Sequence, residues 1–147
     1  MRLISTAIIA LSLFATPVFA QSEEDVMSQI ESLHGDSEGF GEAFGQLQDG
    51  FLFGDLAVTM GNLAFYPLTV DANGEVYDIA EAQDLIDSFD DLVTLETQDA
   101  LASQDFADLI VTSEGVGFGN GALWMSRVCA DDSCNDASWG IIKINNQ

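Results

Sequence analysis

The spacing of apolar residues changes from a helical period to a strand period along this 147-residue chain, and that change limits the fold most. Between Val26 and Leu63, apolar side chains recur three or four positions apart, as they do in amphipathic helices. Ser22 and Asp55 stand where helix caps are expected, and Gly35 ends the first apolar run. The pattern predicts three helices: one ending before Gly35, one over 40–51 and one over 56–63.

A β-hairpin is predicted immediately after these helices. Residues 64–70 and 75–79 have strand-like composition, and Asn73-Gly74 between them is a strong signal for a tight turn. Pro67 cannot donate to a ladder of hydrogen bonds, so the first strand should lie at a sheet edge or contain a bulge.

The remainder of the chain predicts further helices and then a strand-rich third. Asp78 with Glu81 resembles a capping box, followed by a helix bearing Ala82, Leu85, Ile86 and Phe89, and a second short helix covers 97–103. Turn residues then separate four predicted strands, at 106–112, 116–119, 122–129 and 138–144. Helices followed by a hairpin, helices and an antiparallel meander indicate the α+β class.

The first twenty residues have the pattern of a secretory signal peptide. Arg2 precedes the apolar run Leu3 to Phe14, Pro17 breaks it, and Val18-Phe19-Ala20 supplies a small-x-small cleavage site. The run is too short for a membrane anchor, which is the alternative. We therefore expect residues 1–20 to be a signal peptide, residues 21–147 to form a single domain, and the protein to be periplasmic or secreted in a bacterium.

The charge balance excludes several classes of partner. The chain has 3 Lys and Arg against 25 Asp and Glu, a net charge of −22, and loss of Arg2 would make it −23. Nucleic-acid binding is excluded because it needs clustered cations, and anionic membranes are disfavoured after signal cleavage for the same reason. Cations, basic partners and neutral apolar ligands remain open. An apolar fraction of 48% predicts a folded core.

Cys129 and Cys134 are predicted to form a structural disulfide. An exported chain meets an oxidising compartment, where a pair of cysteines is joined by default. Their four-residue spacing is not the CxxC of redox proteins. The short loop predicts a stabilisation of about 2 kcal/mol from loop-closure entropy.

Four segments give the chain a resemblance to a known superfamily. They are 54–57, 66–70, 115–124 and 141–145, within a stretch from Ser37 to Asn145. In these segments the chain resembles the nuclear transport factor 2-like (SnoaL-like) superfamily, with its cystatin-like fold. The resemblance implies a cone-shaped curved antiparallel sheet wrapped around N-terminal helices, a homodimer through the exposed sheet face, and kinship with small exported bacterial proteins without a settled activity.

Candidate site residues are few. Arg127 could anchor an anionic group if it points into the cone, or it could pair with one of the many carboxylates, and Trp124 and Trp139 could pack the sheet or line a pocket. Tyr66, Asp108, Trp124 and Arg127 are the candidate lining of a ligand pocket, and Tyr66 and Asp108 are also the pair that the enzyme hypothesis would use. His34, the sole histidine, is interpreted as structural or solvated at a helix end.

No metal or cofactor is expected. One histidine and two oxidised cysteines do not make a zinc site. Asp131, Asp132, Asn135 and Asp136 form an oxygen-rich loop that we interpret as an exposed turn, with weak calcium binding as the alternative. Gly117 to Gly121 lies in a strand-and-turn context, which does not suit a phosphate-binding loop.

Two functions follow from these patterns. The first is a non-catalytic module that binds a small hydrophobic or weakly anionic ligand or serves as an interaction scaffold, since no catalytic constellation is evident. The second is an enzyme of the cyclase or isomerase type, as in other members of the superfamily. The second requires a carboxylate facing a hydroxyl in a closed pocket.

Overall fold

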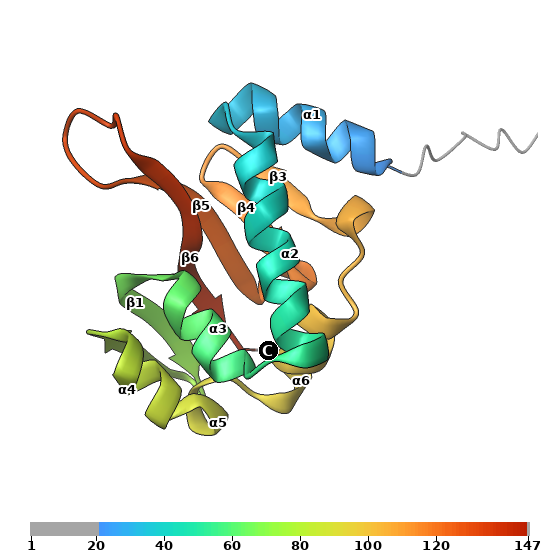
Figure 1. Cartoon of the computed structure of the whole chain (residues 1–147). Helices are drawn as coiled ribbons and strands as arrows, with labels where there is room; N and C mark the ends of the chain where they lie inside the picture. The colour runs from blue at the N-terminus through green and yellow to red at the C-terminus, as the bar shows by residue number, and fades with distance from the viewer. Residues whose placement is uncertain (1–20, 147) are drawn as a thin grey trace, which may run out of the picture.

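The computed structural model describes residues 21–146, so the predicted signal peptide, residues 1–20, lies outside the described part of the chain. Helices form the N-terminal half and cover one side of a sheet formed mostly by the C-terminal third (Figure 1). The helices are α1 Glu23–His34, α2 Ser37–Phe53, α3 Leu56–Leu63, α4 Ala82–Asp87, α5 Phe89–Leu92 and α6 Leu95–Ala102, with 3-10 turns η1 Phe106–Asp108 and η2 Gly119–Gly121.

The predicted helix caps are confirmed. The Ser22 hydroxyl accepts from the Asp25 backbone N–H, and the Asp25 carboxylate accepts from the Ser22 N–H, which completes a capping box. Asp55 caps α3 by accepting from Val58 N–H at 3.3 Å. Gly35 ends α1 at φ 72°, a left-handed conformation that glycine adopts without a steric penalty.

In the described residues, six strands form one mixed sheet that is not closed. They are β1 Ala64–Ala72, β2 Glu75–Ile79, β3 Ile110–Thr112, β4 Gly115–Phe118, β5 Leu123–Cys129 and β6 Ala137–Asn145, in the order β2-β1-β6-β5-β4-β3. The expectation of an all-antiparallel sheet is wrong at one pairing, because β1 and β6 run parallel. The segment with α4, α5 and α6 carries the chain from one sheet edge to the other, and the meander then returns to place β6 beside β1.

One of the two alternatives for Pro67 and the capping box predicted before α4 are wrong. β1 is internal, so the edge alternative for Pro67 fails, and the register between β1 and β6 instead shifts between Ala64 and Thr69, around this proline. Asp78 lies in β2 and accepts from the Thr69 hydroxyl, so the predicted capping box does not form. Glu81 is the N-cap of α4 and makes no side-chain cap bond.

Two predicted elements are also divided in the structure. The single helix expected to reach Phe89 is interrupted at Ser88, which separates α4 from α5. The first part of the strand expected over 106–112 is the turn η1, whose Asp105 cap accepts from Ala107 N–H. Only 110–112 pair with β4.

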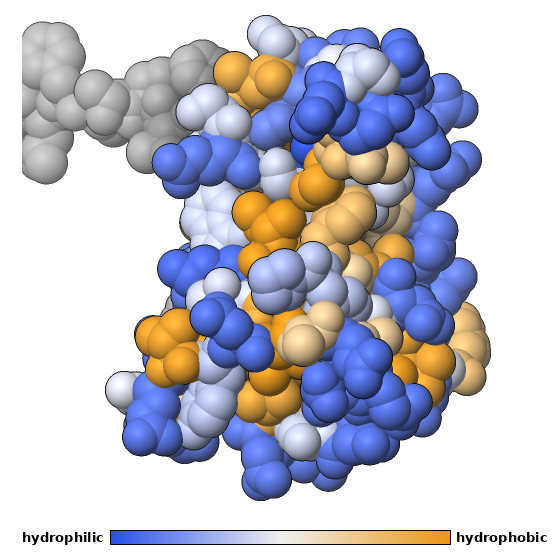
Figure 2. All heavy atoms as spheres, turned by 90° about the vertical axis from the view of Figure 1, so that its left-hand side faces the viewer, coloured by the Kyte–Doolittle hydropathy of each residue, from blue (hydrophilic) through white to orange (hydrophobic). Residues whose placement is uncertain are grey.

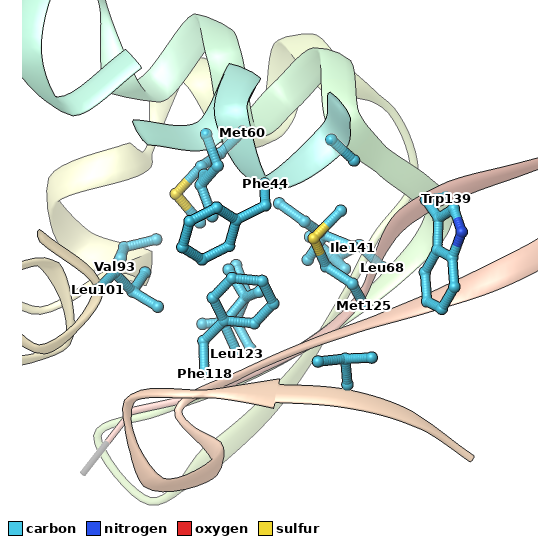
Figure 3. Packing of buried hydrophobic residues seen from close by; sticks show 14 of the residues in the cluster. Phe44, Met60, Leu68, Val93, Leu101, Phe118, Leu123, Met125, Trp139 and Ile141 are labelled. Carbon is cyan, nitrogen blue, oxygen red and sulfur yellow. The ribbon is translucent and has the colours of Figure 1, made fainter. Parts of the chain in front are cut away.

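The space between α2 and the sheet is filled by aromatic side chains. Phe40 contacts Trp139 at 5.0 Å between ring centroids, and Phe44 lies 5.8 Å from Phe118 and 5.0 Å from Phe106. Buried aliphatic residues from the sheet and from α3 to α6 extend this core, and their side chains point toward one another (Figure 3). Burial of these apolar side chains is the main contribution to the stability of the fold.

Candidate functional site

A polar cleft opens where α6, η1 and η2 meet. Its volume is about 360 Å³, and its lining includes the side chains of Glu96, Thr97, Gln104, Asp105, Asp108 and Asn120. Three of these are carboxylates, and the lining contains no cation. The cleft therefore presents hydrogen-bond acceptors in a negative field.

Hydrogen bonds fix the walls of the cleft. The Gln104 side-chain oxygen accepts from Gly119 N–H at 2.6 Å, which ties α6 and the following segment to η2. The Gln104 amide nitrogen donates to the Asp105 carbonyl at 2.7 Å. Thr97 is 1% exposed, and its hydroxyl accepts from the Thr94 hydroxyl at 3.1 Å. The cleft is thus ordered by its own side chains.

Trp124 positions the loop beneath this cleft. Its indole N–H donates to the Gly121 carbonyl at 3.1 Å, and the Asn145 amide donates to the same carbonyl at 3.0 Å. The ring covers Gly117, where a Cβ would lie only 3.1 Å from it. Leu123 and Met125 are buried toward the helices while Trp124 faces the other side, as the predicted alternation requires.

Tyr66 and Asp108, the pair that the enzyme hypothesis would use, do not lie in one pocket. Asp108 is exposed and lines the cleft, whereas Tyr66 lies on β1 outside its lining and donates its hydroxyl to the Gly61 carbonyl at 2.8 Å. Burial raises the pKa of the Tyr66 phenol, and the charge of Asp84 raises it further. The Tyr66 side chain thus packs beside α3, away from the cleft.

Arg127 belongs to a different cluster at the α1–α2 corner. Its Nε lies 3.6 Å from an Asp36 carboxylate oxygen, and its Nη1 donates to the His34 carbonyl at 3.3 Å. In the part of the chain that the structure describes, this is the one ion pair within 4.0 Å. Arg127 thus connects β5 to the corner through a partly exposed contact.

His34 and Trp139 complete this corner. The His34 Nε2 lies 2.9 Å from the Thr112 carbonyl, and its ring meets the Trp139 ring edge-on at 5.1 Å. The Trp139 indole donates to the Asp36 carbonyl at 2.9 Å. These contacts connect the turn between α1 and α2 to β3 and β6, and they give both side chains a packing role.

The predicted disulfide between Cys129 and Cys134 is confirmed. It closes the loop after β5, with 4.8 Å between the two Cα atoms. The Ser133 hydroxyl and N–H donate to the Asp131 carboxylate and lower its pKa. Among residues 21–146, no three His, Cys, Asp or Glu side chains are grouped so as to hold a metal ion.

The sequence pointed to Asp108 but missed the other walls of the cleft. Glu96 and Gln104 flank the predicted 97–103 helix, and Asn120 lies in the glycine-rich turn, but no spacing rule places the two segments face to face.

No helix within residues 21–146 is long and apolar enough to cross a membrane. No family model, curated protein or solved structure matches this chain.

Proposed function

We propose that this protein is an exported, non-catalytic binding module of the nuclear transport factor 2-like type, which takes a small ligand in the cleft between α6 and η2. The observation that carries the proposal is the contrast between a filled interior and an open polar cleft. Phe40, Phe44 and Phe118 occupy the space between helices and sheet, where an enclosed ligand would otherwise lie. The cleft offers ordered polar groups in its place.

The cleft lining favours a ligand that donates hydrogen bonds. The carboxylates of Glu96, Asp105 and Asp108 accept hydrogen bonds, and they would repel a weakly anionic ligand. An ammonium group would gain charge-assisted hydrogen bonds, which are stronger than those of a neutral hydroxyl. We therefore propose a small amine-bearing molecule for this cleft.

The disulfide supports the proposed export, since such bonds persist in oxidising compartments such as the periplasm. The enzyme alternative requires a carboxylate and a hydroxyl converging on one pocket. Asp108 lines the cleft on η1, whereas the Tyr66 hydroxyl on β1 donates to the Gly61 carbonyl, so the binding module is the function we propose.

Calorimetric titration tests the proposal, with putrescine as the cationic probe and butanediol as its neutral match. We expect saturable binding of putrescine and weaker binding of butanediol. A Glu96→Gln, Asp108→Asn variant should lose at least about 10-fold in affinity, because charge-assisted hydrogen bonds are lost. The matched control, Glu114→Gln with Asp132→Asn, changes the net charge equally at exposed sites outside the cleft. Equal losses in both variants would overturn the proposal.

A further inference from the structure

A second concave surface lies between α3 and the α4–α5 pair, away from the polar cleft. It is a groove of about 490 Å³, within the range of roughly 300–1,000 Å³ that is typical of binding sites. Leu56, Ala57, Ile86 and Phe89 supply its apolar lining. We call it the α3–α5 groove.

A glycine sets the shape of the α3–α5 groove. Gly61 on α3 is buried, and a Cβ at this position would lie 2.9 Å from Ile86 Cγ1. Because Gly61 has no side chain, α3 and α4 approach closely and Ile86 packs against α3. Leu56, Ala57 and Ile86 remain partly exposed, so the groove keeps apolar surface that this chain does not cover.

Four aspartates surround this apolar lining. Asp55, Asp87, Asp90 and Asp91 are all exposed, and all line the groove. Asp55 caps α3, and Asp87 accepts from the Gln83 amide at 2.7 Å. Within residues 21–146 the one ion pair shorter than 4.0 Å is Arg127 with Asp36, so neither Arg127 nor Lys143 pairs with the groove carboxylates at that distance.

Two exposed apolar residues precede the groove in the chain. Leu52 is 70% exposed and Phe53 is 87% exposed at the end of α2. Phe53 precedes the groove residue Asp55 by two positions, a separation of at most about 7 Å along the chain. Figure 2 shows that, on the side of the molecule that lies at the left in Figure 1, apolar patches are bordered by hydrophilic residues. Aromatic side chains exposed in this way are typical anchors of protein interfaces.

We propose that the α3–α5 groove docks a basic amphipathic segment of a partner protein. Its apolar residues would cover Leu56, Ile86 and Phe53, and its Lys or Arg side chains would face the four aspartates. Charge complementarity selects this occupant, because a second copy of a chain with net charge −22 would bring like charges together. Anionic lipid is disfavoured by the same repulsion. The proposal does not depend on the ligand of the polar cleft.

A fluorescent amphipathic peptide of Leu and Lys, about three helical turns long, tests the proposal, with a Leu and Glu twin as the negative probe. Fluorescence anisotropy at physiological salt should show saturable binding of the Lys peptide only. An Asp87→Asn, Asp90→Asn, Asp91→Asn variant should bind at least about 5-fold more weakly, and Phe53→Ser about 10-fold more weakly. Asp55 is kept because it caps α3.

The matched control removes three exposed carboxylates outside the groove, as Asp99→Asn, Glu114→Gln, Asp132→Asn. It should bind within about 2-fold of the unchanged protein, because separated exposed charges are screened at physiological salt. Equal losses in the two triple variants would show unspecific attraction to an acidic protein and would overturn the proposal. A dimer that dissociates on Phe53→Ser, without peptide binding, would also overturn it in favour of a second copy.

Discussion

Gly140 on β6 lies close to the junction of α3 and β1. A Cβ at this position would be 2.7 Å from the Leu63 carbonyl oxygen and would also overlap the Phe65 ring. The ring could rotate, but the backbone oxygen is held at the junction of α3 and β1. The small residue at this position is therefore required by packing.

We predict that Gly140→Ala lowers the free energy of unfolding by about 1–3 kcal/mol, the usual cost of overpacking. Gly45→Ala is the control, because a Cβ there meets nothing within 4 Å in the middle of α2. It should raise stability by about 0.5–1 kcal/mol through helix propensity. Urea denaturation measures both, and an unchanged Gly140→Ala protein would refute the packing argument.

Glu31 links the end of α1 to the start of α2. Hydrogen bonds from the Ser37 N–H and hydroxyl, both 2.9 Å, lower the pKa of its carboxyl group, and the charge of Arg127 adds a smaller effect. Because folding lowers the pKa of Glu31, its carboxylate stabilises the folded state at pH values above the ordinary pKa of a glutamate. This stabilisation is lost as the pH falls through the pKa that Glu31 has in the folded state.

We therefore predict that Glu31→Gln is less stable than the unchanged protein at about pH 7 and that the difference shrinks toward about pH 3. Parallel urea titrations across this range measure it. Glu114→Gln, an exposed glutamate whose carboxyl group makes no such contact, is the control. A difference that grows on acidification would contradict the assignment.

At the scale of elements, local signals predicted most of the structure. The Ser22 and Asp55 caps, Gly35 and the Asn73-Gly74 turn act within a few residues, and each appears where it was expected. The parallel pairing of β1 with β6 could not be predicted, because the two strands are about seventy positions apart and their pairing depends on tertiary packing. Asp78 and Glu81 also match a cap pattern that strand pairing overrides.

The loop between β5 and β6 depends on its disulfide. We predict that the double substitution Cys129→Ser, Cys134→Ser lowers the free energy of unfolding by about 2 kcal/mol, because the unfolded chain regains loop entropy. The remaining hydrogen bond from Ala130 N–H to the Asp136 carbonyl, 2.8 Å long, should preserve the strand ends. Urea denaturation of the oxidised and reduced unchanged protein provides the comparison, and a loss of the fold would show a larger role.

The candidate site was predicted less well than the elements. Of the four predicted pocket residues, Asp108 lies in the cleft, whereas Tyr66, Trp124 and Arg127 lie outside its lining. The cleft arises because α6 and η2 meet through the Gln104 to Gly119 hydrogen bond, across fifteen positions. A side-chain hydrogen bond of this kind leaves no periodic pattern in the sequence. The composition therefore predicted an acidic protein but not where an acidic cleft would form.

For the whole molecule, the excess of acidic groups predicts a dependence of stability on salt. Repulsion among 25 acidic residues opposed by 3 cations disfavours the compact state. Raising potassium chloride from about 0.01 M to about 0.5 M screens this repulsion and should raise the melting temperature. Calorimetric scans measure the shift, and a lower melting temperature at high salt would show that specific ion pairs outweigh the repulsion.

The central claim is that an ordered polar cleft on a solid α+β domain is the ligand site. The most direct test is backbone amide NMR of residues 21–147 during titration with putrescine. We predict saturating chemical-shift changes concentrated at Ala100, Ser103 and Asn120, which line the cleft, and few changes elsewhere. Shift changes spread evenly over the acidic surface, or no saturation at all, would contradict it.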